Sequence, residues 1–190
     1  MQNARFQIYT GEGKGKTTCA LGLALRGLGY GWKVYFGQFL KDTETGESRL
    51  LSAMEGVTFQ QFGSGRSLLP GVRAEDVDRE CALRGLECIK HALTSGEYDL
   101  VVADEINMAW VLGMLTEEEW LECAQARTPS TELVFTGRGL PPCAREEADL
   151  ITEMREIKHY YHAGVFAREG IEYRHLPQNA VKIYARRSFL

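Results

Sequence analysis

The sequence YTGEGKGKTTCAL occupies residues 9–21 and directly follows a short apolar run, RFQIY, at residues 5–9. Its order nearly matches the phosphate-binding loop G-x-x-x-x-G-K-[ST], except that Thr10 stands where the first glycine belongs. In that motif a strand runs into the loop and a helix leaves it, here from about Thr17. The stretch therefore predicts an α/β fold in which backbone N–H groups and a helix N-terminus bind a phosphate chain.

We expect the whole loop to contact the phosphates of a nucleotide. Its predicted binding residues are Thr10, Gly11, Glu12, Gly13, Lys14, Gly15, Lys16, Thr17 and Thr18. Glycines let the backbone approach the anion, Lys16 adds a positive charge, and the Thr17 hydroxyl is a predicted magnesium ligand. The alternative is a glycine-rich turn with solvated lysines, which explains the composition of the stretch but not its order and context.

The sequence LVVADE at residues 100–105 reads as an apolar strand that ends in two carboxylates, Asp104 and Glu105. In nucleotide-binding folds such a strand lies beside the first one, and its acids face the magnesium ion. Either acid could instead cap the N-terminus of a helix. Taken together with the loop, both acids are predicted to hold the Mg²⁺ that accompanies ATP.

Short apolar runs alternate along the chain with longer helical patterns. The predicted strands cover residues 5–9, 33–39, 57–62, 99–104, 132–137 and 149–154. This alternation predicts a mostly parallel sheet with helices on both faces. One helix is expected within residues 74–95, with a buried apolar stripe made of Val77, Cys81, Ala82, Leu86, Ile89 and Leu93. Another is expected to open at the capping box of Thr116 and Glu119, with Trp120 in the core.

The composition is that of one globular domain spanning residues 1–190, with 44% hydrophobic and 25% charged residues. A net charge of −4 argues against a nucleic-acid partner, because phosphate backbones favour a basic face. A membrane span needs about 18 consecutive apolar residues, and the sequence has no such run. The first residues read as a strand and not as a signal peptide, and the five scattered cysteines read as reduced thiols, so we expect a cytoplasmic protein.

Four further motifs accompany the loop in a characteristic order. They are GQFLK at 37–41, VVADE at 101–105, TGRG at 136–139 and KHYYHAGVFAREGIEY at 158–173. Together with the Thr-first loop TGEGKGKTT at 10–18, they make the chain resemble the ATP:corrinoid adenosyltransferases of the P-loop type. The resemblance extends over nearly the whole chain, and the combination of motifs is far more specific than the loop alone.

The resemblance implies a RecA-like P-loop NTPase fold, a homodimer, and transfer of the 5′-adenosyl group of ATP to a Co(I) corrinoid with release of triphosphate. It also implies that ATP lies reversed in the loop, with its ribose C5′ turned outward. Lys14, Lys16 and magnesium would neutralise the leaving triphosphate. The resemblance assigns the magnesium to Glu105 in preference to Asp104, and a reductase that supplies Co(I) would be a further partner.

Arg138 of the TGRG motif is expected at the carboxyl edge of the sheet, near the nucleotide or the corrinoid, with a surface ion pair as the alternative. His159 and His162 have the spacing of a ligand pair but lack a third ligand, so we favour polar contacts to a corrin side chain or structural roles. Tyr160, Tyr161 and Phe166 are either core residues or a wall that faces the corrin.

Three segments depart from the family pattern. The first strand begins within a few residues of Met1, where better-known members carry a helical extension that helps cover the active site. The loop at 63–73 offers Leu68 and Leu69 where some members use aromatic residues to displace the lower ligand of cobalt. We expect these leucines to act as an apolar wedge on the lower face of the corrinoid. The chain also continues into a short C-terminal extension at 174–190.

Two other classes of protein remain as alternatives on the sequence. A RecA-like NTPase or small-molecule kinase would use the same loop, and a regulatory module would bind a nucleotide without turning it over. No arginine finger, polarising glutamine or protein-kinase signature can be singled out in the sequence. This favours a reaction that needs neither a general base nor an activated hydroxyl.

Overall fold

A six-stranded parallel sheet forms the centre of the molecule in a computed structural model that describes residues 4–66, 73–168 and 170–172. Its strand order is β3-β2-β4-β5-β1-β6, and all five strand pairs are parallel. The strands are β1 (Phe6–Thr10), β2 (Val34–Phe39), β3 (Val57–Phe62), β4 (Leu100–Asp104), β5 (Glu132–Thr136) and β6 (Leu150–Glu153). Each of the six predicted strands is confirmed, with bounds within one residue.

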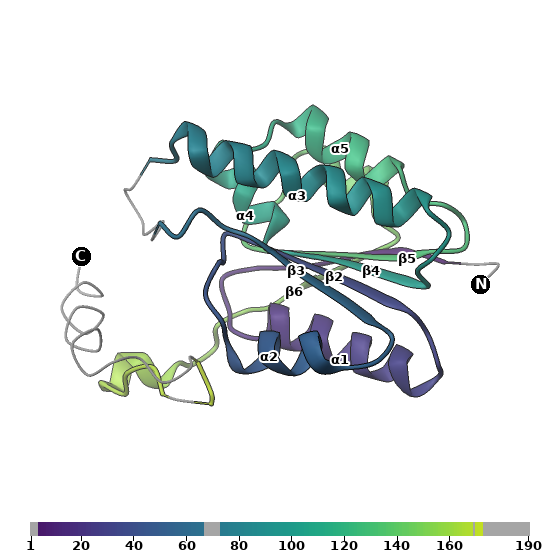
Figure 1. Cartoon of the computed structure of the whole chain (residues 1–190). Coiled ribbons are helices and arrows are strands. Elements are labelled where there is room, and N and C mark those ends of the chain that lie inside the picture. The colour runs from purple at the N-terminus through teal and green to yellow at the C-terminus, as the bar shows by residue number, and fades with distance from the viewer. Residues whose placement is uncertain (1–3, 67–72, 169, 173–190) are drawn as a thin grey trace.

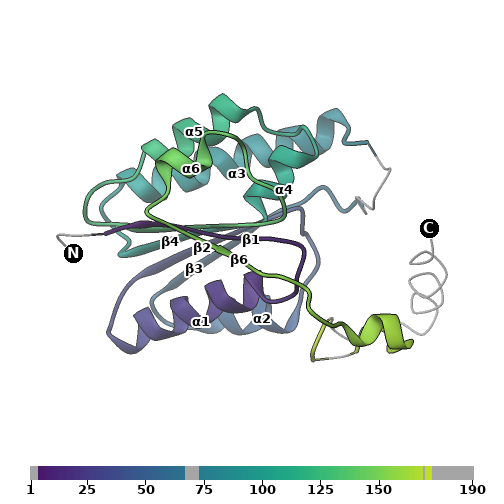
Figure 2. The same ribbon diagram turned by 180° about the vertical axis from the view of Figure 1, so that it is seen from behind.

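Helices cover both faces of this sheet. They are α1 (Lys16–Gly29), α2 (Gly46–Ala53), α3 (Asp76–Thr94), α4 (Ile106–Val111), α5 (Glu117–Gln125) and α6 (Ala144–Glu147), followed by a 3-10 turn, η1 (Tyr160–Ala163). Figure 1 shows α1 and α2 below the sheet and α3, α4 and α5 above it, and Figure 2 shows α6 on the upper face as well. The predicted layering is confirmed.

Two apolar cores separate the helices from the sheet. The core above the sheet includes Phe6, Phe135 and Trp120, whose rings pack edge to face or tilted within 6 Å of one another. The core below it contains Ala20 and Ala24 of α1 with Phe36 and Val102 from the strands. Because the central strands bury both faces, their sequences are largely apolar and do not alternate strictly between apolar and polar residues.

The predicted helix ends and stripes are largely confirmed. Thr116 caps α5, where its hydroxyl accepts a hydrogen bond from the Glu119 N–H and Glu119 completes the capping box. Trp120 is fully buried, as expected. In α3 four of the six stripe residues are buried and Cys81 is partly buried. Val77 is 43% exposed, so its assignment to the core was wrong: it lies in the first turn of α3, on the exposed side of the helix.

The expectation that β4 lies beside β1 was also wrong. In the sheet β5 pairs with both strands and separates them. The order of strands depends on pairings between distant segments, which no local pattern encodes. The carboxyl ends of β1, β2, β4 and β5 nevertheless share one edge of the sheet, where ligands of parallel α/β folds bind.

Candidate active site

The phosphate loop lies between β1 and α1, and the Lys16 side chain folds back onto the backbone of the loop. The Lys16 ammonium donates hydrogen bonds to the carbonyl oxygens of Gly11 at 2.6 Å and Gly13 at 2.8 Å. Burial lowers the pKa of this lysine, and the nearby Glu105 carboxylate partly opposes that shift. Gly15 precedes the helix with a φ of 122°, a conformation that side chains rarely adopt. A positive charge is thus held at the N-terminus of α1, where an anion is already favoured.

The backbone of Met154, just after β6, supports the loop from behind. Its N–H donates to the Thr10 carbonyl at 2.7 Å, and its own carbonyl accepts the Gly13 N–H at 2.8 Å. A Cβ atom on Gly11 or Gly13 would lie only 2.5 or 2.7 Å from this same carbonyl oxygen. Glycine is therefore required at both positions for contact with the protein's own backbone, in addition to any approach to phosphate.

Thr10, the unusual first residue of the loop, has a structural role of its own. Its side chain is buried, and its hydroxyl donates to the Gly139 carbonyl at 3.1 Å. The Gly137 N–H donates in turn to the Tyr9 carbonyl at 3.2 Å. A glycine at position 10 would lose the side-chain hydrogen bond between the phosphate loop and the TGRG loop and keep only the backbone one. The threonine therefore joins two motifs that lie 129 residues apart.

Asp104 is the polar centre of the site and is fully buried. One carboxylate oxygen accepts the hydroxyls of Thr17 at 2.8 Å and Thr136 at 2.7 Å, and the other accepts the Gln38 amide at 2.9 Å. The Lys41 ammonium lies 3.9 Å away. Four side chains from three separate segments of chain thus converge on one carboxylate. This geometry fixes the Thr17 hydroxyl at the mouth of the phosphate loop.

Glu105 differs from its neighbour in both geometry and electrostatics. Its backbone is left-handed, with φ 63°, a costly conformation for a residue other than glycine. Its N–H donates to the Thr136 hydroxyl at 2.9 Å. Within the described chain, no hydrogen bond or ion pair reaches its carboxylate. Desolvation raises the pKa of Glu105, the Asp104 charge adds to this, and Lys41, Lys16 and Arg138 oppose it.

Gln38 and Lys41 are site residues that the sequence reasoning left without a role. Gln38 is fully buried in β2 and also accepts a hydrogen bond from the Gln61 amide at 2.9 Å, which links β3 to Asp104. Leu40, between them, has a positive φ of 65°. The signal was present in the GQFLK motif, because a glutamine in an otherwise apolar central strand needs a buried polar partner.

Two of the predicted site residues, Arg138 and Lys14, lie at the rim of the phosphate loop. Arg138 forms an ion pair with Glu12 at 3.3 Å, with 55% and 76% of the two side chains exposed. This is the surface ion pair that the sequence left open, although Arg138 still lies beside the loop. Thr18 is exposed in the first turn of α1. Lys14 extends away from the other loop side chains, towards Tyr160 and Glu172.

The histidines of the C-terminal motif have structural contacts. The His159 ring accepts the Tyr161 N–H at 3.0 Å at the start of η1, and His162 lies 2.6 Å from the Glu156 carboxylate. Over residues 4–66, 73–168 and 170–172, no three His, Cys, Asp or Glu side chains cluster as a metal site would require. Leu68, Leu69 and the extension at 174–190 lie outside the described residues, so the wedge and the tail stay predictions.

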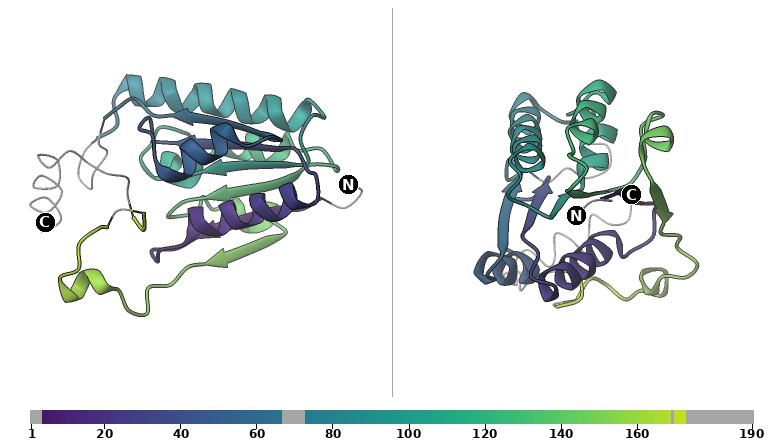
Figure 3. Two further views of the ribbon diagram at one scale, coloured as in Figure 1. Left: turned by 60° about the horizontal axis from the view of Figure 1, so that its bottom comes forward. Right: turned by 90° about the vertical axis from the view of Figure 1, so that its right-hand side faces the viewer.

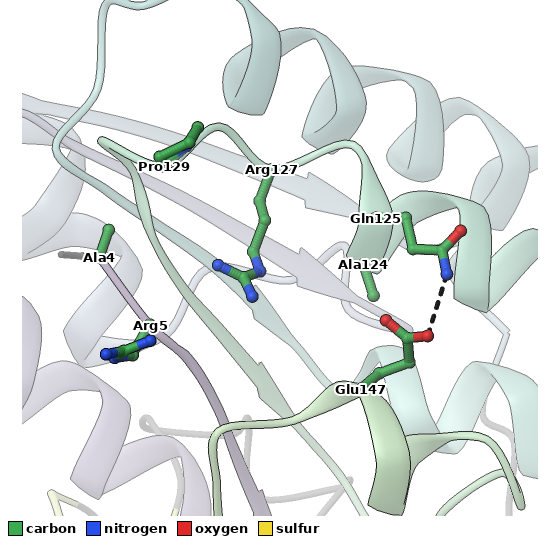
Figure 4. A pocket seen from close by; sticks show the side chains of 7 residues that line it. All are labelled: Ala4, Arg5, Ala124, Gln125, Arg127, Pro129 and Glu147. Atoms are coloured by element: carbon green, nitrogen blue, oxygen red, sulfur yellow. Dashed lines mark hydrogen bonds between the residues drawn. The ribbon is translucent and has the colours of Figure 1, made fainter. Parts of the chain in front are cut away.

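A hollow of about 450 Å³ lies at the edge of the sheet opposite the phosphate loop. Figure 4 shows the Arg127 side chain pointing into this hollow. At one side of the hollow the Gln125 amide donates a hydrogen bond to the Glu147 carboxylate. Both arginines that line it are already engaged, since Arg5 and Arg127 contact the same Asp149 carboxylate at 3.5 and 3.4 Å. Among its lining residues this hollow therefore offers no unpaired positive charge for a triphosphate. No helix in the described part of the chain is long and apolar enough to cross a membrane.

Comparison with known proteins agrees with this site. Residues 2–173 match the family model described as ATP:corrinoid adenosyltransferase BtuR/CobO/CobP. A corrinoid adenosyltransferase of Pseudomonas aeruginosa is 35% identical over 168 residues, covering 87% of this chain and 82% of that protein. One from Escherichia coli K12 is 34% identical over 166 residues, covering 87% and 84%.

A solved structure of a KaiC-like protein from Pyrococcus horikoshii OT3 is similar in fold, with a TM-score of 0.52 and 15% identity over 80% of this chain and 74% of that one. It confirms the prediction of a RecA-like α/β fold. The family model covers the phosphate loop, both acids and the TGRG loop, which are the elements that meet at the carboxyl edge of the sheet. The chain belongs to the ATP:corrinoid adenosyltransferase BtuR/CobO/CobP family.

Proposed function

We propose that this protein transfers the 5′-adenosyl group of ATP to the cobalt of a Co(I) corrinoid and releases intact triphosphate. The observation that carries the proposal is the junction of the phosphate loop with Asp104 through the Thr17 hydroxyl. That junction supports a triphosphate site at the N-terminus of α1. The family supports the choice of acceptor.

The reaction balances without a general base. The lone pair of Co(I) forms the bond to C5′ of the ribose, and the C5′–O bond breaks with its electron pair passing to triphosphate. Cobalt is formally oxidised by two electrons in the alkylated product, and no proton moves. The protein has to align the two substrates and stabilise the charge of the leaving group. Lys16 and the loop N–H groups are suited to that second task.

Magnesium is the cofactor we propose for this site, held by Thr17 and Glu105. The donor set fits, because the Glu105 carboxylate has no hydrogen-bond partner among described residues and Thr17 is fixed beside the loop. Asp104 would orient the Thr17 ligand and not bind the metal itself, since three donors already occupy its oxygens. The ion would supply positive charge to the triphosphate oxygens.

Glu105→Gln is expected to raise the magnesium concentration that gives half-maximal activity by about tenfold, since it removes one charged ligand. In the parent protein the same concentration should rise as the pH falls. The Glu105 pKa is raised by burial, so protons compete with the metal above the ordinary range of a carboxyl group. Magnesium titrations at several pH values measure both effects.

Glu147→Gln, at the remote hollow, is the matched control and should leave the titration unchanged. A magnesium requirement that rises for Asp104→Asn but stays normal for Glu105→Gln would reverse the two roles.

The products of the reaction test the proposed function directly. With ATP, magnesium and chemically reduced corrinoid, we expect phosphorus NMR of the quenched mixture to show triphosphate. The corrinoid should gain the absorbance of a cobalt–carbon bond and lose it again in light. A kinase or NTPase would form ADP whether or not corrinoid is present, and a regulatory module would form neither product. Corrinoid-independent ADP as the main product would replace our proposal with the NTPase alternative.

We further propose that the protein works as a cytoplasmic homodimer and receives Co(I) corrinoid from a reductase. The resemblance of the chain to the adenosyltransferase family supports both the dimer and the reductase. So do exposed apolar side chains on the edge strand and after it, where Leu150, Ile151 and Ile157 are 44%, 37% and 91% exposed. Such side chains suit a surface that a second copy covers. Sedimentation at micromolar concentration should give twice the 21.3 kDa chain mass.

A further inference from the structure

The C-terminal segment, defined here as residues 156–172, returns to the phosphate loop after leaving the sheet. Figure 1 shows it beyond the end of the sheet at which α1 begins, and the left view of Figure 3 shows it extending away from β6. It carries η1 and then brings Glu172 next to Lys14. The described residues of the motif AGVFAREGIEY therefore include one that contacts the phosphate loop, although the two segments are far apart along the chain.

Every donor of the Lys14 ammonium points to this segment. The Nζ atom lies 2.6 Å from the Glu172 carboxylate, 2.9 Å from the Tyr160 hydroxyl and 3.4 Å from the Ile171 carbonyl. An ammonium has three N–H groups, so these contacts satisfy it completely. The Tyr160 ring also lies 5.7 Å from the ammonium. Lys14 is therefore bound by the C-terminal segment and contacts neither of the loop carbonyls that hold Lys16.

The Glu172 carboxylate, which pairs with the Lys14 ammonium, is held in place by several further donors. Its carboxylate also accepts the Arg168 N–H at 2.7 Å and the Tyr160 hydroxyl, and the Arg168 guanidinium lies 3.5 Å away. Only 17% of its side chain is exposed, even though the segment lies outside the sheet. Hydrogen bonds from Lys14 and then Tyr160 lower the pKa of Glu172 to about 2. The carboxylate is consequently charged throughout the neutral range.

Apolar packing gives the segment little support. Val165, Phe166 and Ile171 are 39%, 47% and 57% exposed. With Tyr161 set aside, the hydrogen bonds that join residues 156–172 to residues 4–155 in the described chain all end at Lys14. The Lys14 side chain thus helps to fix the position of these apolar side chains relative to the phosphate loop.

We propose that Lys14 is a positioning residue that seats the C-terminal segment beside the phosphate loop, with Glu172 and Tyr160 as its receptors, so that the segment forms a wall for the corrinoid. The proposal rests on the proposed function and deepens it. A flat macrocycle must come within bonding distance of C5′ of an ATP held in the loop. Exposed apolar side chains fixed to that loop are suited to contact it. Lys14 then serves the acceptor and not the triphosphate.

Steady-state kinetics separate these two roles. We expect Lys14→Met, Glu172→Gln and the double variant each to raise KM for the corrinoid by about fivefold, the upper range for a partly exposed ion pair. The double variant should match the single ones, because all three lose the same interaction. KM for ATP should change by less than about twofold. If Lys14→Met raises KM for ATP while Glu172→Gln does not, Lys14 acts on the triphosphate and the proposal fails.

Hydrogen exchange without substrates tests the seating independently of activity. Amides of residues 156–172 should exchange faster in Lys14→Met and in Glu172→Gln than in the parent protein. Glu156→Gln is the matched control: it removes a carboxylate of the same segment whose partner, His162, lies within the segment. Unchanged exchange in both test variants overturns the proposal. Faster exchange in a protein that forms no cobalt–carbon bond would uphold the seating and reject the proposed function instead.

Discussion

Lys16→Ala is expected to lower kcat for adenosyl transfer at least about 100-fold, even with saturating ATP. Its ammonium is buried and held over the loop by the carbonyls of Gly11 and Gly13, so it is in place to meet charge that develops on the triphosphate. Removing one such preorganised group typically costs about 10²- to 10³-fold in rate. Thr17→Ala should act in the same direction, because it loses the bond to Asp104 as well as a magnesium ligand.

Thr17→Ser is the control for that pair, since it keeps the hydroxyl and should keep most of the activity. Thermal unfolding of each variant distinguishes loss of catalysis from loss of fold. Near-normal turnover of Lys16→Ala would mean that the loop has been assigned to the wrong ligand.

Asp104→Asn should damage stability and turnover together. The carboxylate is fully buried and accepts three hydrogen bonds, one of them from the Gln38 amide. An asparagine amide turned either way leaves at least one of these donors facing another donor. The loss of charge-assisted bonds in a buried site should lower the free energy of unfolding by roughly 2–4 kcal/mol. Turnover should fall at least about 100-fold, because Thr17 loses its anchor.

Asp149→Asn offers the comparison at the other edge of the sheet. Asp149 accepts the Phe6 N–H at 2.8 Å but is exposed, so we expect a loss below about 1 kcal/mol. Denaturant unfolding and steady-state rates measure both variants. Equal stability for the two variants would contradict the role of Asp104 as the buried centre of the site.

The strands and their layers could be predicted from sequence because the signals are local. Apolar runs of strand length alternate with helical patterns, and each run became a strand. The order of the strands could not be predicted in the same way. The insertion of β5 between β1 and β4 depends on the pairing of β1 with β5, which joins residues more than 120 apart, such as Phe6 and Leu133. The exposure of Val77 likewise depends on tertiary packing, which the local helical pattern does not encode.

The site residues also fall into those that local motifs predict and those that only long-range contacts reveal. Lys16, Thr17, Asp104 and Glu105 belong to short motifs, and the structure brings these four residues together at one end of the sheet. The contact between Lys14 and Glu172 joins residues 158 apart, and no spacing rule points to it. Gln38 was within reach, because a lone glutamine inside an apolar strand indicates a buried polar partner.

The support that Met154 gives to the phosphate loop has a consequence for synthesis of the protein. The phosphate loop leaves the ribosome well before the backbone that holds Thr10 and Gly13 in place, because that backbone comes from residue 154. At about 5–20 residues per second, the intervening chain takes on the order of 10 s to make. Through that interval the nascent chain has the nucleotide motif without its supporting wall. ATP can therefore meet a fully supported phosphate loop only after residue 154 has been made.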